Sequence, residues 1–246
     1  MGYLIHTLDP RTWLIEEEAP ECNVYMYLLA GEKEAVLIDS GYGTIPLDEL
    51  TASLTALPVT VLCTHGHFDH IGGVSFFSNI RMHRADRTLY QQHRLEVRKI
   101  APGCIAPEAP QELQWFDGPI TLELGDRTLK VFPVPGHTGG CVVILDVERR
   151  QLFTGDTCCK GPVLLNFDDS TDLVTYHSSI RFILDMQEHY HTTWPAHHAK
   201  PLGTEIPRQF LEAAELLITG QSQGSADPDS GSTDKRFPYK DISIIY

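Results

Sequence analysis

Basic residues are scarce in this chain, and their scarcity excludes one broad class of partners. Lysine and arginine together number 19, against 33 aspartate and glutamate residues, so the formal net charge is −14 at pH 7. Nucleic acids and anionic membrane surfaces bind proteins through clustered positive charge. We therefore expect neither nucleic acid nor a membrane as the main partner of this chain.

Long apolar runs and disulfide-type cysteine spacings are also missing. No segment approaches the ~18 consecutive apolar residues that a membrane-spanning helix needs. The first ten residues lack the basic and apolar regions of a secretory signal. The six cysteines show no framework spacing, and none forms a Cys-x-x-Cys pair. A chain of this length can build a large core without disulfides, so we expect reduced thiols and a cytoplasmic location.

The segment Val59–Gly73, VTVLCTHGHFDHIGG, is the most informative part of the sequence. It begins with β-branched and apolar residues, which predict a buried strand. His65, His67, Asp69 and His70 then follow within six positions. Imidazole nitrogen and carboxylate oxygen are ligands for Zn²⁺ and other first-row metals, and buried polar groups need a hydrogen bond or a metal. The segment therefore predicts metal ligands on an irregular loop after a strand, and the alternative is a solvated polar loop.

Four further polar residues follow predicted strands in the same manner. Asp39 ends an apolar run, and His137, Asp156 and His197 each lie in a turn of small residues directly after a strand. Taken alone, each of the last three is more often a capped turn residue than a metal ligand. Because the same context recurs at four strand ends, we expect His137, Asp156 and His197 to join the first cluster.

The predicted elements occur in the same order twice, as strands followed by helix, strand and helix. The predicted strands cover 23–30, 35–38, 59–63, 80–82, 120–124, 128–134, 141–147 and 151–154, with a further short strand ending at 194. This order predicts an α/β fold of two similar halves, whose sheets face each other with helices outside. We expect 1–246 to form a single domain.

Local patterns in the sequence predict several further helices, loops and a terminal strand. Thr44 is predicted to cap a helix that has Pro46 in its first turn, and further helices are expected at 73–77, 85–93, around 173–184 and at 210–218. Residues 99–110 predict a loop beside the site. The polar segment 220–235 predicts a mobile surface loop, and 237–246 predicts one terminal strand.

With these motifs in order, the chain resembles the metallo-β-lactamase superfamily of metallohydrolases. The resemblance covers LIDSG at 37–41, THGHFDH at 64–70, PGHTGG at 135–140, FTGD at 153–156 and PAHH at 195–198. It implies an αββα four-layer sandwich of two facing mixed β-sheets with outer helices, and a dinuclear metal site at one edge. The ligands that it implies are His65, His67 and His137 for the first metal, Asp69, His70 and His197 for the second, and Asp156 for both. Asp39 is expected to support the ligand loops.

Within that superfamily, His70 and the bridging Asp156 resemble glyoxalase II, lactonases and thioesterases rather than true β-lactamases. The resemblance implies two Zn²⁺, or Mn²⁺ or iron in their place, and a metal-bridged hydroxide that attacks a small ester, thioester or lactone. Asp69 is expected to bind metal and to orient this nucleophile. The expected partner is a small-molecule substrate.

Three residues near the ligands are predicted substrate contacts: Cys158, Lys160 and His198. Other activities stay open at this point. A persulfide dioxygenase-like oxidoreductase of the same fold would bind one iron through residues such as His65, His137 and Asp156. A phosphodiesterase of the same fold is the other enzymatic alternative, and a non-catalytic descendant is disfavoured because every ligand is present.

Overall fold

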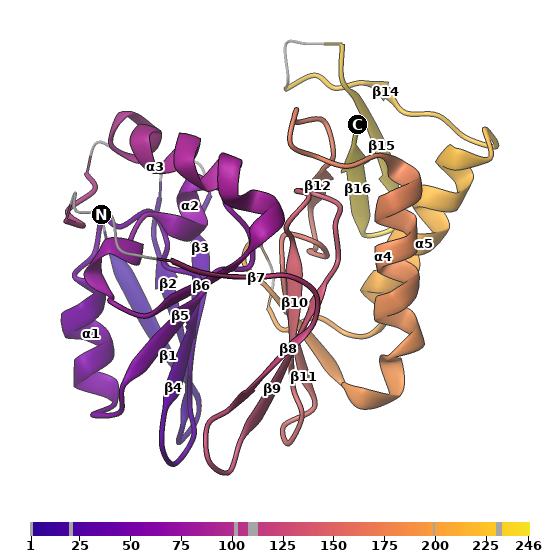
Figure 1. Cartoon of the computed structure of the whole chain (residues 1–246). Coiled ribbons are helices and arrows are strands. Elements are labelled where there is room, and N and C mark those ends of the chain that lie inside the picture. The colour runs from indigo at the N-terminus through magenta and orange to yellow at the C-terminus, as the bar shows by residue number, and fades with distance from the viewer. Residues whose placement is uncertain (1, 20–21, 101–102, 108–112, 199, 230–232) are drawn as a thin grey trace. The chain divides into compact units, whose positions relative to one another are not determined.

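The computed structural model describes residues 2–19, 22–100, 103–107, 113–198, 200–229 and 233–246 (Figure 1). The chain divides into two compact units, Met1–Lys130 and Val131–Tyr246, which we call unit 1 and unit 2. The single domain expected over 1–246 stays a prediction.

Unit 1 contains a seven-stranded sheet in which the spatial order of the strands equals their order in the chain. The strands are β1 (Tyr3–Asp9), β2 (Thr12–Glu17), β3 (Val24–Ala30), β4 (Ala35–Ile38), β5 (Val59–Leu62), β6 (Ile80–His83) and β7 (Leu113–Phe116). The first four pair in antiparallel fashion, whereas β4 to β7 are parallel. Since parallel strands end at one edge of a sheet, the loops that follow β4 and β5 begin side by side.

The helices of unit 1 fill the connections between its parallel strands. They are α1 (Leu47–Leu54), α2 (Phe68–Ile71) and α3 (Arg87–Ile100), with 3₁₀ turns at Val74–Phe76 and Arg84–Asp86. Leu47 and Leu50 of α1 are buried with the apolar residues of β3, β4 and β5 in one core cluster. Burial of this kind is the main force that holds such helices on a sheet.

The second sheet has the order β13-β11-β10-β9-β8, and the division between the units falls within β9. Its strands are β8 (Ile120–Glu123), β9 (Thr128–Pro133), β10 (Val142–Asp146), β11 (Gln151–Gly155) and β13 (Thr192–Pro195). β10 and β11 are antiparallel, whereas β11 and β13 are parallel. The turns after β11 and β13 therefore leave the same edge of this sheet.

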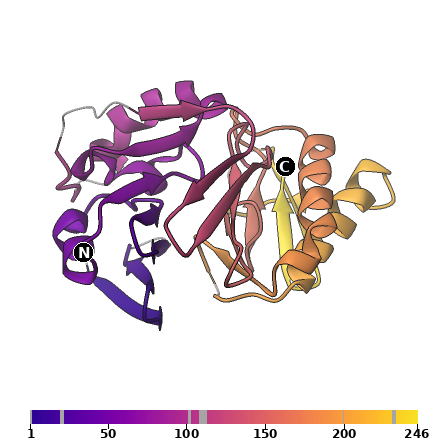
Figure 2. The ribbon, with the colours of Figure 1, turned by 60° about the horizontal axis from the view of Figure 1, so that its bottom comes forward.

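Unit 2 also holds a small four-stranded sheet and two long helices. The sheet has the order β12 (Pro162–Leu164), β16 (Ile242–Ile245), β15 (Lys235–Tyr239) and β14 (Ser225–Ala226). α4 (Leu173–Asp185) and α5 (Glu205–Ile218) run side by side, and α5 packs against β16 (Figure 1, Figure 2). A 3₁₀ turn at Gln187–His189 follows α4. Tyr176, Ile180 and Phe210 are fully buried in the core of this unit.

The predicted cap of the first helix is wrong. The N-cap position of α1 is Pro46, and no side chain caps this helix. Thr44 instead donates hydrogen bonds from its amide and its hydroxyl to the buried carboxylate of Glu17. A carboxylate on a neighbouring strand end offers a stronger acceptor than the helix offers, and sequence spacing does not reveal it.

Other element boundaries also differ from the predictions. The helix predicted at 85–93 runs on to Ile100, and the one predicted at 73–77 is the 3₁₀ turn Val74–Phe76. The single strand predicted at 237–246 is a hairpin, because Lys240 turns the chain with a φ of 50° between β15 and β16. The segment 220–235, predicted as a loop, contains β14 and the first residue of β15, and its residues 230–232 lie outside the described residues. Of the loop predicted at 99–110, residues 101–102 and 108–110 lie outside the described residues.

Two predictions concern the whole chain. All six cysteines are free thiols, and five of them are buried. In the part of the chain that the structure describes, no helix is both long enough and apolar enough to cross a membrane.

Candidate metal centre

In unit 1, the loop after β5 carries two of the predicted ligands. Its backbone is held by hydrogen bonds to two carboxylates. Asp39 accepts the Thr64 amide at 2.7 Å and the Thr64 hydroxyl at 2.8 Å. Asp86 accepts the amide of Gly66 at 2.8 Å. These charged acceptors fix a loop that lies outside the regular hydrogen bonding of the sheet.

Asp39 also reaches the helix that carries the other two ligands. Its Oδ2 atom lies 2.9 Å from Nδ1 of His70, and both side chains are fully buried. The backbone of Asp39 has a φ of 60°, a left-handed conformation that aspartate tolerates better than most residues. One carboxylate thus contacts both the loop after β5 and α2.

These contacts determine which nitrogen of each ring carries the proton. The Thr64 hydroxyl donates to Asp39, so its oxygen accepts from Nδ1 of His65, 3.1 Å away. Nδ1 of His70 donates to Asp39 in the same way. In the neutral form of either ring, the lone pair then lies on Nε2, as in a histidine that binds metal through Nε2.

The remaining contacts of this cluster bring ligand atoms toward one another. Nε2 of His65 lies 3.1 Å from Nδ1 of His67, and Nε2 of His70 lies 3.5 Å from Oδ2 of Asp69. The three histidines are buried, and 15% of the Asp69 side chain is exposed. Buried nitrogen and oxygen lone pairs that converge in this manner fit a bound cation.

His93 of α3 is a further functional candidate, which the sequence motifs do not include. Its ring stacks on His67, with ring centroids 5.2 Å apart and 22° between the planes. Its Nδ1 atom accepts the amide of Phe68 at 3.2 Å, where α2 begins. Because His93 lies 23 to 28 residues after the ligands, sequence spacing gave no signal for this contact.

In unit 2, Nδ1 of His137 contacts a hydrogen-bond acceptor, as Nδ1 of His70 does in unit 1. Its Nδ1 atom lies 2.7 Å from the carbonyl oxygen of Leu164, and a carbonyl can only accept. The hydroxyl of Ser170 donates to the carbonyl of His137 at 2.8 Å. In the neutral ring, the lone pair of His137 therefore lies on Nε2.

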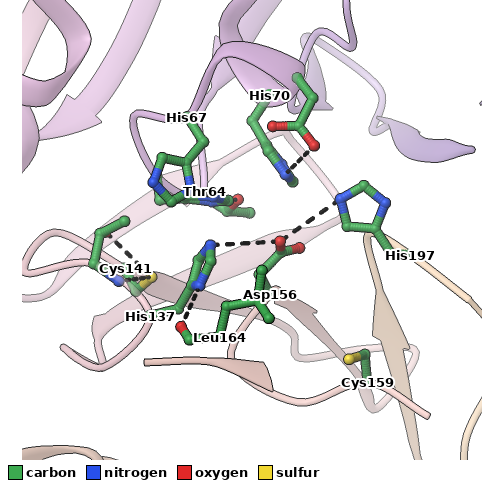
Figure 3. A network of polar contacts seen from close by, with 12 residues as sticks. Thr64, His67, His70, His137, Cys141, Asp156, Cys159, Leu164 and His197 are labelled. Atoms are coloured by element: carbon green, nitrogen blue, oxygen red, sulfur yellow. Dashed lines mark hydrogen bonds and ion pairs between the residues drawn. The ribbon is translucent and has the colours of Figure 1, made fainter. Parts of the chain in front are cut away.

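Asp156 occupies the middle of the unit 2 cluster. Its Oδ2 atom lies 3.6 Å from Nε2 of His137 and 3.6 Å from Nε2 of His197 (Figure 3). The amide of Ala196 donates to the carbonyl of Gly155 at 3.1 Å, which ties together the ends of β11 and β13. One oxygen of Asp156 lies equally far from the Nε2 atoms of two histidines. This position fits a carboxylate that binds metal together with both of these histidines.

The three predicted substrate contacts lie in different surroundings. Lys160 and His198 are exposed, and the ring of His198 lies against Gly161. Cys158 is fully buried in the core of unit 2, and burial raises the pKa of its thiol, which keeps it protonated and unreactive. Burial of Cys158 does not favour contact with substrate, and for Lys160 and His198 such contact stays a prediction.

The donor set as a whole fits divalent first-row metals. Each unit offers imidazole nitrogens together with a partly exposed carboxylate. The predicted ligands are all histidine or aspartate, and none is cysteine. Such mixed nitrogen and oxygen ligands suit Zn²⁺, Mn²⁺ and iron, so the donor chemistry does not select one of these ions.

Residues 19–217 match the model of the metallo-beta-lactamase superfamily. The chain is 27% identical over 188 residues to "Acyl-coenzyme A thioesterase MBLAC2" of Gallus gallus, which covers 65% of this chain and 67% of that protein. It is 35% identical over 133 residues to the hydroxyacylglutathione hydrolase of Anaeromyxobacter dehalogenans, which covers 54% of this chain and 45% of that protein. The names of both relatives denote hydrolases, in agreement with the predicted class of enzyme.

Among solved structures, the metallo-beta-lactamase from Pontibacter korlensis is similar with a TM-score of 0.67 and 18% identity. The alignment covers 87% of this chain and 99% of that one. This likeness confirms the predicted fold class.

Proposed function

Because the chain belongs to the metallo-beta-lactamase superfamily, we propose that its strand-end ligands form one dinuclear centre that hydrolyses thioesters. One metal would be held by His65, His67 and His137, the other by Asp69, His70 and His197, and both by Asp156. The support from unit 1 is the convergence of buried lone pairs around His65 and His70. The support from unit 2 is the position of Asp156 relative to its two histidines.

The residues of the chain have separate tasks in this reaction. Divalent cations held by these ligands would supply Lewis acidity and lower the pKa of a bound water toward about 7. Asp69 is partly exposed, so its carboxylate can accept a hydrogen bond from the attacking water and orient it. Asp39, Thr64 and Leu164 keep the ligand histidines in the protonation state that binds metal.

The proposal of a thioester as substrate rests on the names of the two relatives. The two relatives act on different carriers, coenzyme A and glutathione, yet both names denote a thioester. In the reaction, the water oxygen bonds to the acyl carbon and the carbon–sulfur bond breaks. One proton of the water is released from the new carboxylic acid, and the other ends on the thiol. A thiol has a pKa of about 8.5, so a thiolate can leave without prior protonation. The proposed reaction therefore needs no separate general acid.

A substrate panel tests this function. Wild-type protein loaded with Zn²⁺ should hydrolyse a butyryl thioester with a higher kcat/KM than a lactone, bis-p-nitrophenyl phosphate or a cephalosporin. Asp69→Asn should lower kcat by about 10²-fold or more, the scale of a positioned acid–base group. The exposed Asp185 supplies the matched control, and Asp185→Asn should match wild type. A phosphodiester as best substrate would refute the proposal.

Metal analysis tests the centre independently of activity. Protein purified without chelators should contain two divalent ions per chain, and Asp156→Ala should lose both. His197→Ala should mainly weaken one of them, because His197 is proposed as a ligand of a single metal. A single iron per wild-type chain would instead favour the dioxygenase-type activity.

A further inference from the structure

Two neighbouring cavities follow α3 in unit 1. The first has a volume of about 260 Å³ and lies among α2, α3 and residues 103–107. The second has a volume of about 360 Å³ and extends along α3 toward β7. They share Tyr90, Arg94 and Leu95 as lining residues. Volumes of this order approach those of small-molecule sites, which span roughly 300–1,000 Å³.

The lining of these cavities is basic in a strongly acidic chain. Residues 81–99 contain six arginines and lysines against two acids, in a chain whose net charge is −14. Arg87 and Arg94 are seven positions apart, which places them two turns apart on the same face of α3. Both are exposed, and Arg98 lines the first cavity. None of the described lining residues is acidic, so this surface favours an anion.

Aromatic side chains lie next to these guanidinium groups. Tyr90 and Trp115 pack edge to face, with ring centroids 5.8 Å apart, and both line the second cavity. Trp115 is partly exposed, and the side chain of Arg94 hydrogen-bonds to Tyr90. Arginines bind phosphate in bidentate fashion, and aromatic faces stack on nucleobases. Together these groups match a ligand that combines phosphate with a planar base.

The same helix contacts the ligand residues of unit 1. His93 precedes Arg94 and stacks on His67. The first cavity is lined by Ile71 and Gly72, which directly follow the ligand His70. A ligand in these cavities would therefore extend along α3 from the ligand helix α2 toward Trp115.

We propose that the cavities along α3 bind the phosphorylated adenosine end of a coenzyme A thioester. This inference rests on the proposed thioesterase function and specifies the carrier of the acyl group. Arg87 and Arg94 contact the phosphates, and the partly exposed Trp115, which packs on the buried Tyr90, contacts the adenine. Pantetheine and glutathione thioesters lack both the phosphates and the base, so neither can make these two kinds of contact.

Direct binding tests the cavities without any reaction. Adenosine 3′,5′-bisphosphate should bind the metal-loaded protein in calorimetry, and binding should weaken as salt is added. The double variant Arg87→Gln/Arg94→Gln should bind it about tenfold or more weakly, since charge-assisted hydrogen bonds to two cations are lost. Arg84→Gln is the matched control, because Arg84 lies one turn away, pairs with Asp117 and lines neither cavity. Equal binding by all three proteins, or none by wild type, would overturn the proposal.

Kinetics separate this inference from the proposed function. Butyryl-coenzyme A should have a lower KM than butyryl-pantetheine, and the double variant should raise the first KM while leaving the second within about twofold. If both thioesters are hydrolysed equally well, the carrier site is wrong and the thioesterase stands. If neither is hydrolysed, the proposed function fails, and calorimetry still decides on the nucleotide site. An effect of the double variant confined to an acyl-carrier-protein thioester would assign the arginines to a carrier protein instead.

Discussion

At the scale of single residues, Asp39 shows how one carboxylate can contact both a proposed ligand and the loop that carries two others. It accepts two hydrogen bonds from Thr64 and one from His70. All three donors are buried with it. Each bond removes one alternative orientation of a ligand ring or of the loop beside it. In the proposed centre, the arrangement of these ligands would therefore depend on a residue that need not touch the metal.

Replacing Asp39 with asparagine should weaken metal binding. Asparagine keeps the left-handed backbone, but its amide group turns a donor toward Thr64 or His70. Loss of such an outer contact typically lowers metal affinity about 10–100-fold. Competition with a chelator and the thermal unfolding midpoint measure the effect. The control is Asp117→Asn, at an exposed ion pair with Arg84, and unchanged affinity in Asp39→Asn would contradict the supporting role.

His93 should act as a positioning residue for the ligand loop. His93→Ala removes both the ring stacked on His67 and the acceptor for the Phe68 amide, so it should weaken metal binding. His93→Gln restores an acceptor and should recover part of the affinity. Chelator competition separates the two variants. Identical affinities in wild type, His93→Ala and His93→Gln would show that α3 plays no part in ordering the ligands.

At the scale of elements, strand ends were the most predictable feature of this protein. All four predicted ligand turns follow strands in the structure, as does Asp39 after β4. Apolar runs and the small polar turns after them are local patterns, so they can be recognised from the sequence alone. The tautomers of His65, His70 and His137 were not predictable, since they depend on contacts with Thr64, Asp39 and Leu164. The role of Glu17 was missed for the same reason.

Glu17 accepts hydrogen bonds that link β2 to the turn before α1. Its titration should make the free energy of unfolding depend on pH. Burial is the largest cause that raises the pKa of its carboxyl above the usual 4.5, against the hydrogen bonds of Thr44 and Tyr42. A raised pKa in the folded state means that folding favours the protonated acid. Its contribution to stability is therefore present at low pH and is lost as pH rises from 4.5 through the raised value.

Glu17→Gln isolates this contribution, because glutamine does not titrate. The difference in unfolding free energy, wild type minus variant, should fall as pH increases through that window and then level off. Denaturant unfolding of both proteins at several pH values measures it. A difference that rises with pH would mean that the ionised carboxylate is the favoured form.

At the scale of the whole molecule, the proposed ligands come from both units. Four lie in unit 1 and three in unit 2, so bound metal would couple the stability of one unit to that of the other. The fold class was predictable from the twofold order of strands and helices together with the ligand motifs. The hairpin at the C-terminus was not, because its turn depends on the conformation of Lys240 and not on a glycine or proline signal.

Removal of metal should therefore lower the stability of the entire chain. A ligand present at about one hundred times its Kd adds about 2.7 kcal/mol to the free energy of unfolding. Dialysis against a chelator should lower Tm, and returned Zn²⁺ should restore it. Asp156→Ala, which is expected to bind neither metal, serves as control and should respond to neither treatment. An unchanged Tm in wild type would show that metal binding and folding are not linked.

The reaction of the native cysteine thiols with an added reagent can measure local opening of the folded structure. Cys22 is partly exposed, whereas the thiols of Cys63 and Cys104 are enclosed in unit 1 and those of Cys141, Cys158 and Cys159 in unit 2. A maleimide pulse on the native protein should modify Cys22 first. Peptide mass mapping at later times then records, without any mutation, when each interior first becomes accessible to reagent. The order in which the two sets of thiols react shows whether unit 1 and unit 2 open at the same time or one after the other.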